Sequence, residues 1–387
     1  MGIKTGFPAL IITVLFAALF FPHPAAGRTK LSHAKTAGVK KGNAAILPAQ
    51  ECSKCHSDIF RNWKQSRHAA AYENPVFQTA YRKTWLEEGL AAARLCLPCH
   101  APTVTITGDY TAAEVITREG VTCNFCHGVT AVEMPAVPAK GSGYSHGRDK
   151  QPASAAAANE MNQNKNHGAY FTEARPCAGC HDFENRHKVP IGTTWSEWRA
   201  SSSATAGDHC QKCHMPLIAG RTANKDGRDE MHDHSLATTL ESMSGAVTAE
   251  IADITVSGNA VTASITIRNV KAGHFVPTGS PARSLVLEIR LMNAAGNVLE
   301  TQKRIYRKTV TDRNGNEITS FDGAFLHAAA VTADNRIGPG ESRTETVLFR
   351  TSPGENATVA AELYLLTTPA VAQREEMKIP LSTPGIN

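Results

Sequence analysis

The sequence predicts two unlike parts: a mainly α-helical and irregular domain over residues 51–240, and an all-β sandwich domain over residues 245–387. The first observation is the distribution of cysteine, because all ten cysteines lie between residues 52 and 213. The second is the hydrophobic period, which changes from about 3.6 residues in the first part to about 2 in the second. The change in composition near residue 240 marks the expected domain boundary.

The overall composition is that of a globular protein. The 387 residues are 42% hydrophobic and 19% charged, which excludes a disordered or fibrous chain and allows two or three domains. Aromatic residues make up only 6%, so something other than Phe, Tyr and Trp is expected to fill the centre of the first domain.

The N-terminus has the layout of a cleaved secretory signal. A lysine precedes an apolar stretch over residues 7–21, and prolines and small residues follow it. We predict a signal peptide over residues 1–27 and a flexible basic leader over residues 28–50. An uncleaved anchor is the alternative, although the stretch is shorter than the roughly 20 residues that span a bilayer. We therefore expect a periplasmic or extracellular protein with no membrane span after signal cleavage.

Residues 51–240 combine short helices with a long irregular stretch. Apolar residues recur at intervals of three and four in residues 57–72 and 74–95, which predicts helices there. Residues 131–168 are rich in Pro, Gly, Ala and Asn and predict a surface loop. Loops of that length inside a compact domain usually need an unusual anchor.

Residues 245–387 contain β-branched or alternating stretches separated by turn signals such as AAGN, RNGN and GPGE. The clearest stretches are residues 261–270, 284–306, 344–351 and 358–368. Their number and spacing predict an antiparallel, immunoglobulin-like sandwich of roughly seven strands.

All ten cysteines form CxxCH motifs. The motifs are CSKCH (Cys52, Cys55, His56), CLPCH (Cys96, Cys99, His100), CNFCH (Cys123, Cys126, His127), CAGCH (Cys177, Cys180, His181) and CQKCH (Cys210, Cys213, His214). This spacing lets two thioethers hold the edge of a haem while the adjacent imidazole reaches the iron. We predict a pentahaem cytochrome domain with five covalently bound haem c groups and the five motif histidines as proximal ligands. Five flat apolar porphyrins would also account for the low aromatic content.

Other uses of paired cysteines explain the pattern less well. Zinc sites built from CxxC pairs need two pairs per metal, so five pairs would leave one unmatched. Neither zinc binding nor a redox disulfide requires a histidine after every second cysteine.

The second axial ligand of each iron must come from elsewhere. Nine histidines lie outside the motifs, the signal and the leader, so the supply suffices for every iron. The predicted distal ligands are His68, His167, His187, His234 and His274. His146 and His327 are reserves, and His209, next to Cys210, could serve only a neighbouring haem.

Local context supports these choices. His68 follows the first motif on the helix predicted over residues 57–72, and His167 could anchor the long loop. His187 follows the fourth motif closely, and His274 lies at a strand end where a Gly and a Pro restrict the backbone. His232 and His234 alternate on an extended segment, so one of the two is expected to bind, with His234 preferred. Met215 is an alternative ligand, but we predict that it packs in the interior.

Several longer motifs are more specific than CxxCH alone: ECSKCHSDIFRNWKQSRHA, EGVTCNFCHGV, CAGCHDFENRHKVPIGTTWSEWRAS, RDEMHDHS and AGHFVPTGSPAR. They cover most of residues 51–290 and resemble the multihaem cytochromes of the cytochrome c-554 type. The resemblance implies an axial ligand at His68, similar roles for His167, His234 and His274, and electron transfer through closely stacked haems. The second W-x-x-S segment has Ser203 where the first has His68, which leaves the partner of one haem open.

Three functions fit the sequence. The preferred one is an electron carrier between periplasmic or extracellular redox proteins. The first alternative is a reductase or oxidase of a small nitrogen or sulfur compound, which needs one iron with an exchangeable position. The second is a subunit of a cytochrome assembly or a homo-oligomer. The formal charge of +5 does not imply a nucleic-acid partner, because haem propionates would offset it.

Overall fold

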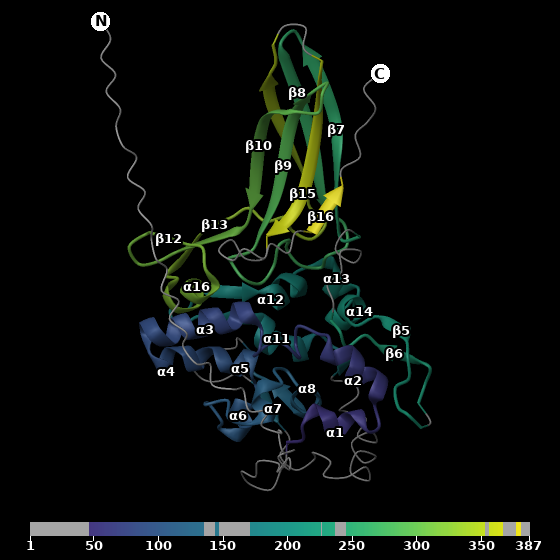
Figure 1. Cartoon of the computed structure of the whole chain (residues 1–387), viewed down its shortest axis with the longest axis vertical. Helices are drawn as coiled ribbons and strands as arrows, with labels where there is room; N and C mark the ends of the chain where they lie inside the picture. The colour runs from purple at the N-terminus through teal and green to yellow at the C-terminus, as the bar shows by residue number, and fades with distance from the viewer. Residues whose placement is uncertain are drawn as a thin grey trace, which may run out of the picture. The chain divides into compact units, whose positions relative to one another are not determined.

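The computed structural model describes residues 46–134, 144–146, 171–225, 227–236, 245–352, 356–366 and 377–380 (Figure 1). The predicted signal peptide, most of the leader and His167 lie outside these residues. Short helices dominate residues 46–236, here called the CxxCH region, and strands dominate residues 245–380, here called the β region. Within the described ranges, no helix is both long and apolar enough to cross a membrane.

The CxxCH region is built from helices of mostly one or two turns. They are α1 Ala49–Ser53, α2 Ser57–Lys64, α3 Pro75–Glu88, α4 Leu90–Ala93, η1 Arg94–Cys96, α5 Leu97–His100, α6 Val104–Thr107, α7 Val115–Arg118, α8 Cys123–Gly128, α11 Arg175–His181, α12 Thr194–Arg199, α13 Ser202–Thr205 and α14 Cys210–His214. Three two-stranded ladders accompany them: β1 Val129–Val132 with β2 Tyr144–His146, β3 Asp182–Glu184 with β4 Pro190–Thr193, and β5 Leu217–Ala219 with β6 Glu230–His232.

Each CxxCH motif lies on or beside a short helix. The third, fourth and fifth motifs lie within α8, α11 and α14. Residues three apart on a helix share a face, so one turn places both cysteines of a motif on the same side. The local fold therefore presents each pair of sulfurs as one attachment site.

Two expectations for this region were wrong. The helix expected over residues 57–72 ends at Lys64, so His68 lies in a turn, where Ser66 Oγ accepts a hydrogen bond from the Ala69 backbone N–H at 2.9 Å. In the loop expected over residues 131–168, residues 131–132 and 144–146 belong to the β1–β2 ladder, and most of the other loop residues lie outside the described part of the chain. Burial of Val129 and Val132 in a cluster with Phe125 favours that ladder over a solvated loop.

Gly89 divides the stretch expected as one helix over residues 74–95. Asn74 caps α3, its side chain accepting hydrogen bonds from the Val76 and Phe77 backbone N–H groups. Gly89 has a φ of 87°, which ends α3 before α4 begins.

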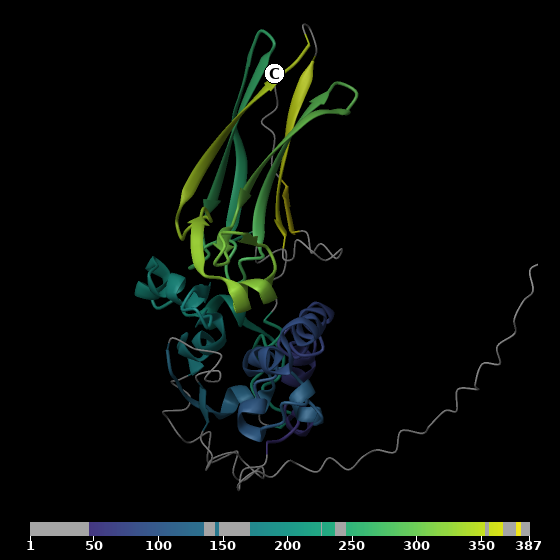
Figure 2. The same cartoon turned by 90° about the vertical axis from the view of Figure 1, so that its left-hand side faces the viewer.

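The β region contains three antiparallel sheets. Their strands are β7 Val247–Ser257, β8 Ala260–Asn269, β9 Ser284–Asn293, β10 Val298–Tyr306, β11 Lys308–Thr311, β12 Glu317–Ile318, β13 Ala330–Asp334, β14 Ser342–Arg350, β15 Ala357–Leu366 and β16 Met377–Pro380. The sheet orders are β10-β9-β15-β16, β14-β8-β7 and β12-β11-β13. The first two form separate layers (Figure 2). The expected β-sheets are confirmed, and the immunoglobulin-like topology stays a prediction.

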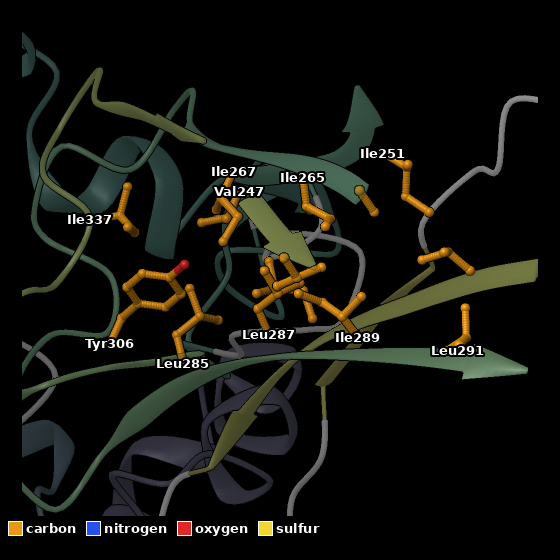
Figure 3. Close-up of a cluster of buried hydrophobic side chains, with 14 of the residues drawn as sticks. Val247, Ile251, Ile265, Ile267, Leu285, Leu287, Ile289, Leu291, Tyr306 and Ile337 are labelled. Atoms are coloured by element: carbon orange, nitrogen blue, oxygen red, sulfur yellow. The ribbon is translucent and has the colours of Figure 1, made fainter. Parts of the chain in front are cut away.

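One hydrophobic core joins the two larger sheets. Ile265 and Ile267 of β8 face Leu285, Leu287 and Ile289 of β9 (Figure 3), and all five are completely buried. Alternate residues of β8 point into this core, as the period of two predicts. Aliphatic side chains, together with Tyr306 and Phe349, thus fill this interior.

A smaller cluster joins the β region to the CxxCH region. Helix α16, Phe321–His327, carries Ala324, which packs with Val310 of β11 and with Val189 and Ile191 beside the fourth motif. Gly38–Asn387 accordingly forms one compact unit.

Candidate functional site

The five attachment sites adjoin one another in space. The first cysteine of the first motif, Cys52, contacts the first cysteine of the third motif, Cys123. Cys177 and Cys210, the first cysteines of the fourth and fifth motifs, make the same contact. The first and third motifs therefore form one pair, and the fourth and fifth motifs form another.

Further contacts connect the two pairs and add the second motif. Cys99 of the second motif contacts Cys180 of the fourth. Cys126 of the third motif lies close enough to Cys180 for electrostatic interaction. The first motif thus contacts the third, and the third lies beside the fourth. The second and fifth motifs both contact the fourth.

The paired motifs belong to an internal structural repeat. In the first copy, Trp63 donates from Nε1 to the Val121 carbonyl at 3.0 Å, and the Val121 N–H donates to the His68 carbonyl at 2.9 Å. Val121 lies two residues before the third motif, so these bonds join the W-x-x-S-x-H segment to that motif.

The second copy repeats these bonds before the fifth motif. Trp198 Nε1 donates to the Asp208 carbonyl at 2.8 Å, and the Asp208 N–H donates to the Ser203 carbonyl at 2.8 Å. Ser203 therefore takes the structural place of His68, as the sequence comparison of the two segments suggests. It has no imidazole, so the second copy offers no ligand at this position.

His68 lies opposite the histidine of the fourth motif. The ring centres of His68 and His181 are 6.3 Å apart. A metal–imidazole nitrogen bond is about 2.0–2.1 Å and the nitrogen lies roughly 1.1 Å from the ring centre, so two imidazoles on opposite sides of one metal have centres about 6.2–6.4 Å apart. The spacing of these two rings fits a single iron between them.

His274 lies opposite the histidine of the fifth motif. The ring centres of His214 and His274 are also 6.3 Å apart, with an angle of 17° between the ring planes. His274 belongs to the loop between β8 and β9, so the β region supplies one of the two rings.

His234 lies close to the histidine of the first motif. His56 acts electrostatically on His234, and the segment before His234 covers the first motif. The Asn224 N–H donates to the Cys55 carbonyl at 2.7 Å, and the His234 N–H donates to Asn62 Oδ1. The structure thus brings three of the predicted distal histidines, His68, His234 and His274, to motif histidines.

The Nδ1 atoms of several histidines face backbone carbonyls, which leaves Nε2 available to a metal. These pairs are His56 with Thr222 (2.5 Å), His100 with Ala71 (3.0 Å), His232 with Met215 (2.8 Å), His234 with His232 (2.7 Å) and His274 with Phe275 (2.9 Å). A carbonyl only accepts, so Nδ1 carries the proton in each pair.

Burial favours the neutral, metal-binding form of His68, His181, His214, His234 and His274. It lowers the pKa of His68 to about 4 and, aided by the charge of His68, that of His181 to about 3. Burial also lowers the pKa values of His214, His234 and His274. A neutral imidazole at pH 7 can coordinate iron without first losing a proton.

A cavity lies beside the second motif. Cys96, Cys99 and His100 line it together with apolar side chains, among them Phe321 and Phe325 of α16. The Thr84 hydroxyl also lines it and is buried without a hydrogen-bond partner. Attachment sulfurs, apolar walls and an unpaired hydroxyl fit a haem carrying polar substituents.

Phenylalanine rings lie beside two further motif histidines. The ring of His100 stacks on Phe77 at 4.0 Å, and the ring of His127 lies 5.3 Å from that of Phe171. His167, the predicted ligand in the long loop, lies outside the described residues.

His187 is the fifth predicted distal ligand. Its Nδ1 faces Nη2 of Arg313 at 3.3 Å in an exposed contact. A guanidinium only donates, so Nδ1 is the acceptor in this contact and Nε2 carries the proton. His187 could coordinate iron through Nε2 only if this contact broke.

His209, His232 and His327 have other contacts, and the side chain of His146 lies outside the described part of the structure. His209 Nδ1 accepts a hydrogen bond from the Ala174 N–H at 3.2 Å, and His327 Nε2 lies 3.2 Å from Glu88 Oε1. His232, on β6, directs Nδ1 to the Met215 carbonyl.

Sequence reasoning missed a buried charge cluster at the boundary of the two regions. Glu197 of α12 and Arg336 form an ion pair at 2.8 Å, and the side chains are 6% and 4% exposed. Lys308 is buried beside them, and this burial lowers its pKa to about 8. No local pattern marks these residues, because ordinary charged side chains from distant segments meet only in the fold.

The fold and the CxxCH motifs are similar to those of multihaem c-type cytochromes. Residues 51–128 match the family model described as cytochrome c554 and c-prime. No curated protein sequence matches the chain.

One solved structure is similar over most of the chain. The penta-heme cytochrome c552 from Thermochromatium tepidum superimposes with a TM-score of 0.67 and 21% sequence identity, covering 86% of this chain and 97% of the other. At this identity the likeness concerns the fold. A β-glucuronidase mutant from Bacteroides uniformis aligns over 31% of this chain and 11% of its own, with 13% identity and a TM-score of 0.16, too low to support an argument.

Proposed function

We propose that this chain is an exported pentahaem cytochrome that transfers electrons between periplasmic or extracellular redox proteins. The contiguity of the five attachment sites carries this proposal. Cysteines of neighbouring motifs contact one another, so groups attached through them would lie close together along the whole set. A continuous series of redox centres suits electron transfer through the protein.

The ten motif cysteines would hold five haem c groups, and the five motif histidines would be the proximal ligands. For the distal ligands we propose His234 opposite His56, His68 opposite His181, and His274 opposite His214. The two spacings of 6.3 Å support the last two pairs. His167 and His187 remain the predicted partners for the other two irons.

A bound haem supplies one-electron redox chemistry, and the protein sets its potential through axial ligands, burial and hydrogen bonds. Here burial favours the neutral form of His234 and His274, and Nδ1–H bonds to carbonyls orient both rings. Such bonds also raise the basicity of the coordinating nitrogen. Iron held between two such imidazoles has no position for a substrate, which favours a carrier.

The cavity beside His100 favours a second candidate function. Apolar side chains line it, and no second imidazole borders it within the described part of the chain. If the second haem keeps an exchangeable position there, the protein could reduce or oxidise a small nitrogen or sulfur compound. A subunit role in a cytochrome assembly is a third candidate, in which a neighbouring chain would supply that ligand.

Three measurements on the purified holoprotein test these functions. Pyridine haemochrome absorbance should give five haems per chain, and paramagnetic resonance should count the low-spin and high-spin ferric irons. A carrier should be wholly low-spin and unchanged by cyanide or nitrite. A high-spin iron that binds nitrite would instead support the enzyme, and fewer than five haems would overturn the pentahaem assignment.

A further inference from the structure

The loop that carries His274 contacts the CxxCH region at one buried carboxylate. Glu197 Oε2 accepts hydrogen bonds from the Phe275 backbone N–H at 3.2 Å and from the Thr278 hydroxyl at 2.6 Å. These two donors lie on the C-terminal side of His274. Glu197 itself lies on α12, between the fourth and fifth motifs.

The other oxygen of Glu197 is held equally firmly. Oε1 accepts from the Thr193 hydroxyl at 2.6 Å and from Arg336 Nη1 at 2.8 Å. Arg336 also donates to the Pro277 carbonyl at 3.1 Å, and its guanidinium lies 4.9 Å from the centre of the Phe275 ring. Four donors therefore fix one carboxylate, and two of them belong to the His274 loop.

The charge on Glu197 is stable in this buried place. Burial opposes ionisation, but the Arg336 charge and the hydroxyl donors lower the pKa of Glu197 overall. An ionised carboxylate can accept from all four donors at once. Breaking a buried pair by removing one partner leaves the other uncompensated, so the cluster resists displacement.

We propose that Glu197 is a positioning residue that holds His274 opposite His214, so that the fifth iron gains its second imidazole only when the β region is docked on α12. This inference rests on the proposed ligand role of His274. Glu197 would act through the loop backbone, without touching the iron or its ligands.

A close contact on the other side of His274 supports this assignment. A Cβ added to Gly273 would lie 2.9 Å from Ser203 Cβ and 3.1 Å from the Trp198 ring. The loop therefore approaches the second copy of the repeat as closely as a glycine allows. Together, Glu197 and this contact locate the loop on both sides of the histidine.

The test compares four variants of the holoprotein. In Glu197→Gln, the amide nitrogen must face either Arg336 or the Phe275 N–H, neither of which can accept a hydrogen bond. Asp334→Asn is the matched control, because Asp334 also accepts from Arg336 at 2.7 Å and the same charge is lost. Gly273→Ala displaces the loop sterically, and His274→Ala removes the ligand itself.

The readouts are carbon monoxide bound per chain after reduction and the high-spin fraction in paramagnetic resonance. We expect His274→Ala to bind one more carbon monoxide per chain than the wild type. Glu197→Gln and Gly273→Ala should gain a large fraction of that additional site. Asp334→Asn should gain none. Should Glu197→Gln fail to accumulate with five haems, Gly273→Ala and Asp334→Asn decide the question.

The proposal is overturned if Glu197→Gln or Gly273→Ala matches the wild type while His274→Ala gains a site. It is also overturned if Asp334→Asn gains as much as Glu197→Gln, because the effect would then be one of charge. If His274→Ala itself gains nothing, the ligand assignment in the proposed function fails instead.

Discussion

Replacement of His68 by alanine tests the clearest of the proposed iron sites. The ring of His68 lies 6.3 Å from that of His181, the spacing expected for two imidazoles on one metal. Its removal would leave His181 as the single protein ligand of that iron. With five CxxCH motifs in the chain, the expected change is one iron in five, so a fifth of the ferric signal should change from low-spin to high-spin.

The assay is spin quantification by paramagnetic resonance on oxidised His68→Ala, with carbon monoxide titration of the reduced protein. We expect one additional carbon monoxide site per chain. His68→Met is the matched variant, since a thioether can keep the iron six-coordinate and raise its potential. The reasoning is refuted if His68→Ala retains the wild-type spin count and binds no extra carbon monoxide.

Three further predictions use matched positions in the chain. His234→Ala should create one high-spin iron while His232→Ala creates none, as spin counts would establish. Gly120→Ala and Gly207→Ala both place alanine at positive φ, at a cost of about 1–2 kcal/mol in stability. Only at Gly120 would the new Cβ lie 2.4 Å from a backbone carbonyl oxygen. The melting temperature of Gly120→Ala should therefore fall further than that of Gly207→Ala. The pKa of Lys308 is about 8 in the folded protein and 10.5 in the unfolded chain. Between pH 8 and 10.5 the unfolded state therefore binds more protons, so the stability of the wild type rises with pH in this range. The free-energy difference between Lys308→Met and wild type should therefore shift by about 3 kcal/mol in favour of wild type from pH 8 to 10.5, visible in the melting temperatures of both proteins.

Some of this architecture follows directly from local sequence. The CxxCH spacing needs one helical turn, and the alternation in residues 261–270 and 284–306 predicts β8, β9 and β10. Both signals depend on residues close together in the chain, where period and spacing suffice. The apolar period also predicts a helix that continues past His68, and this prediction was wrong. The helix ends at Lys64, and Ser66 Oγ accepts a hydrogen bond from the Ala69 N–H in the turn that follows.

The pairing of ligands could not be predicted in this way. His68 follows the first motif, yet it lies opposite the histidine of the fourth. His274 lies opposite His214 only because the β8–β9 loop contacts α12. Such partners depend on tertiary packing of segments far apart in sequence, and neither Glu197 nor Arg336 carries a local mark of its role.

The internal repeat gives a physical reason why the β region takes part in the site. In the first copy, the turn after α2 directs His68 forward to the fourth motif, which belongs to the second copy. In the second copy, the position equivalent to that of His68 lies shortly before the fifth motif and holds no histidine. Ser203 stands there instead, and its small side chain lets Gly273 approach closely. That approach leaves the ring centre of the next residue, His274, 6.3 Å from that of His214 in the fifth motif. We therefore propose that the β region supplies the ligand that the second copy of the repeat lacks.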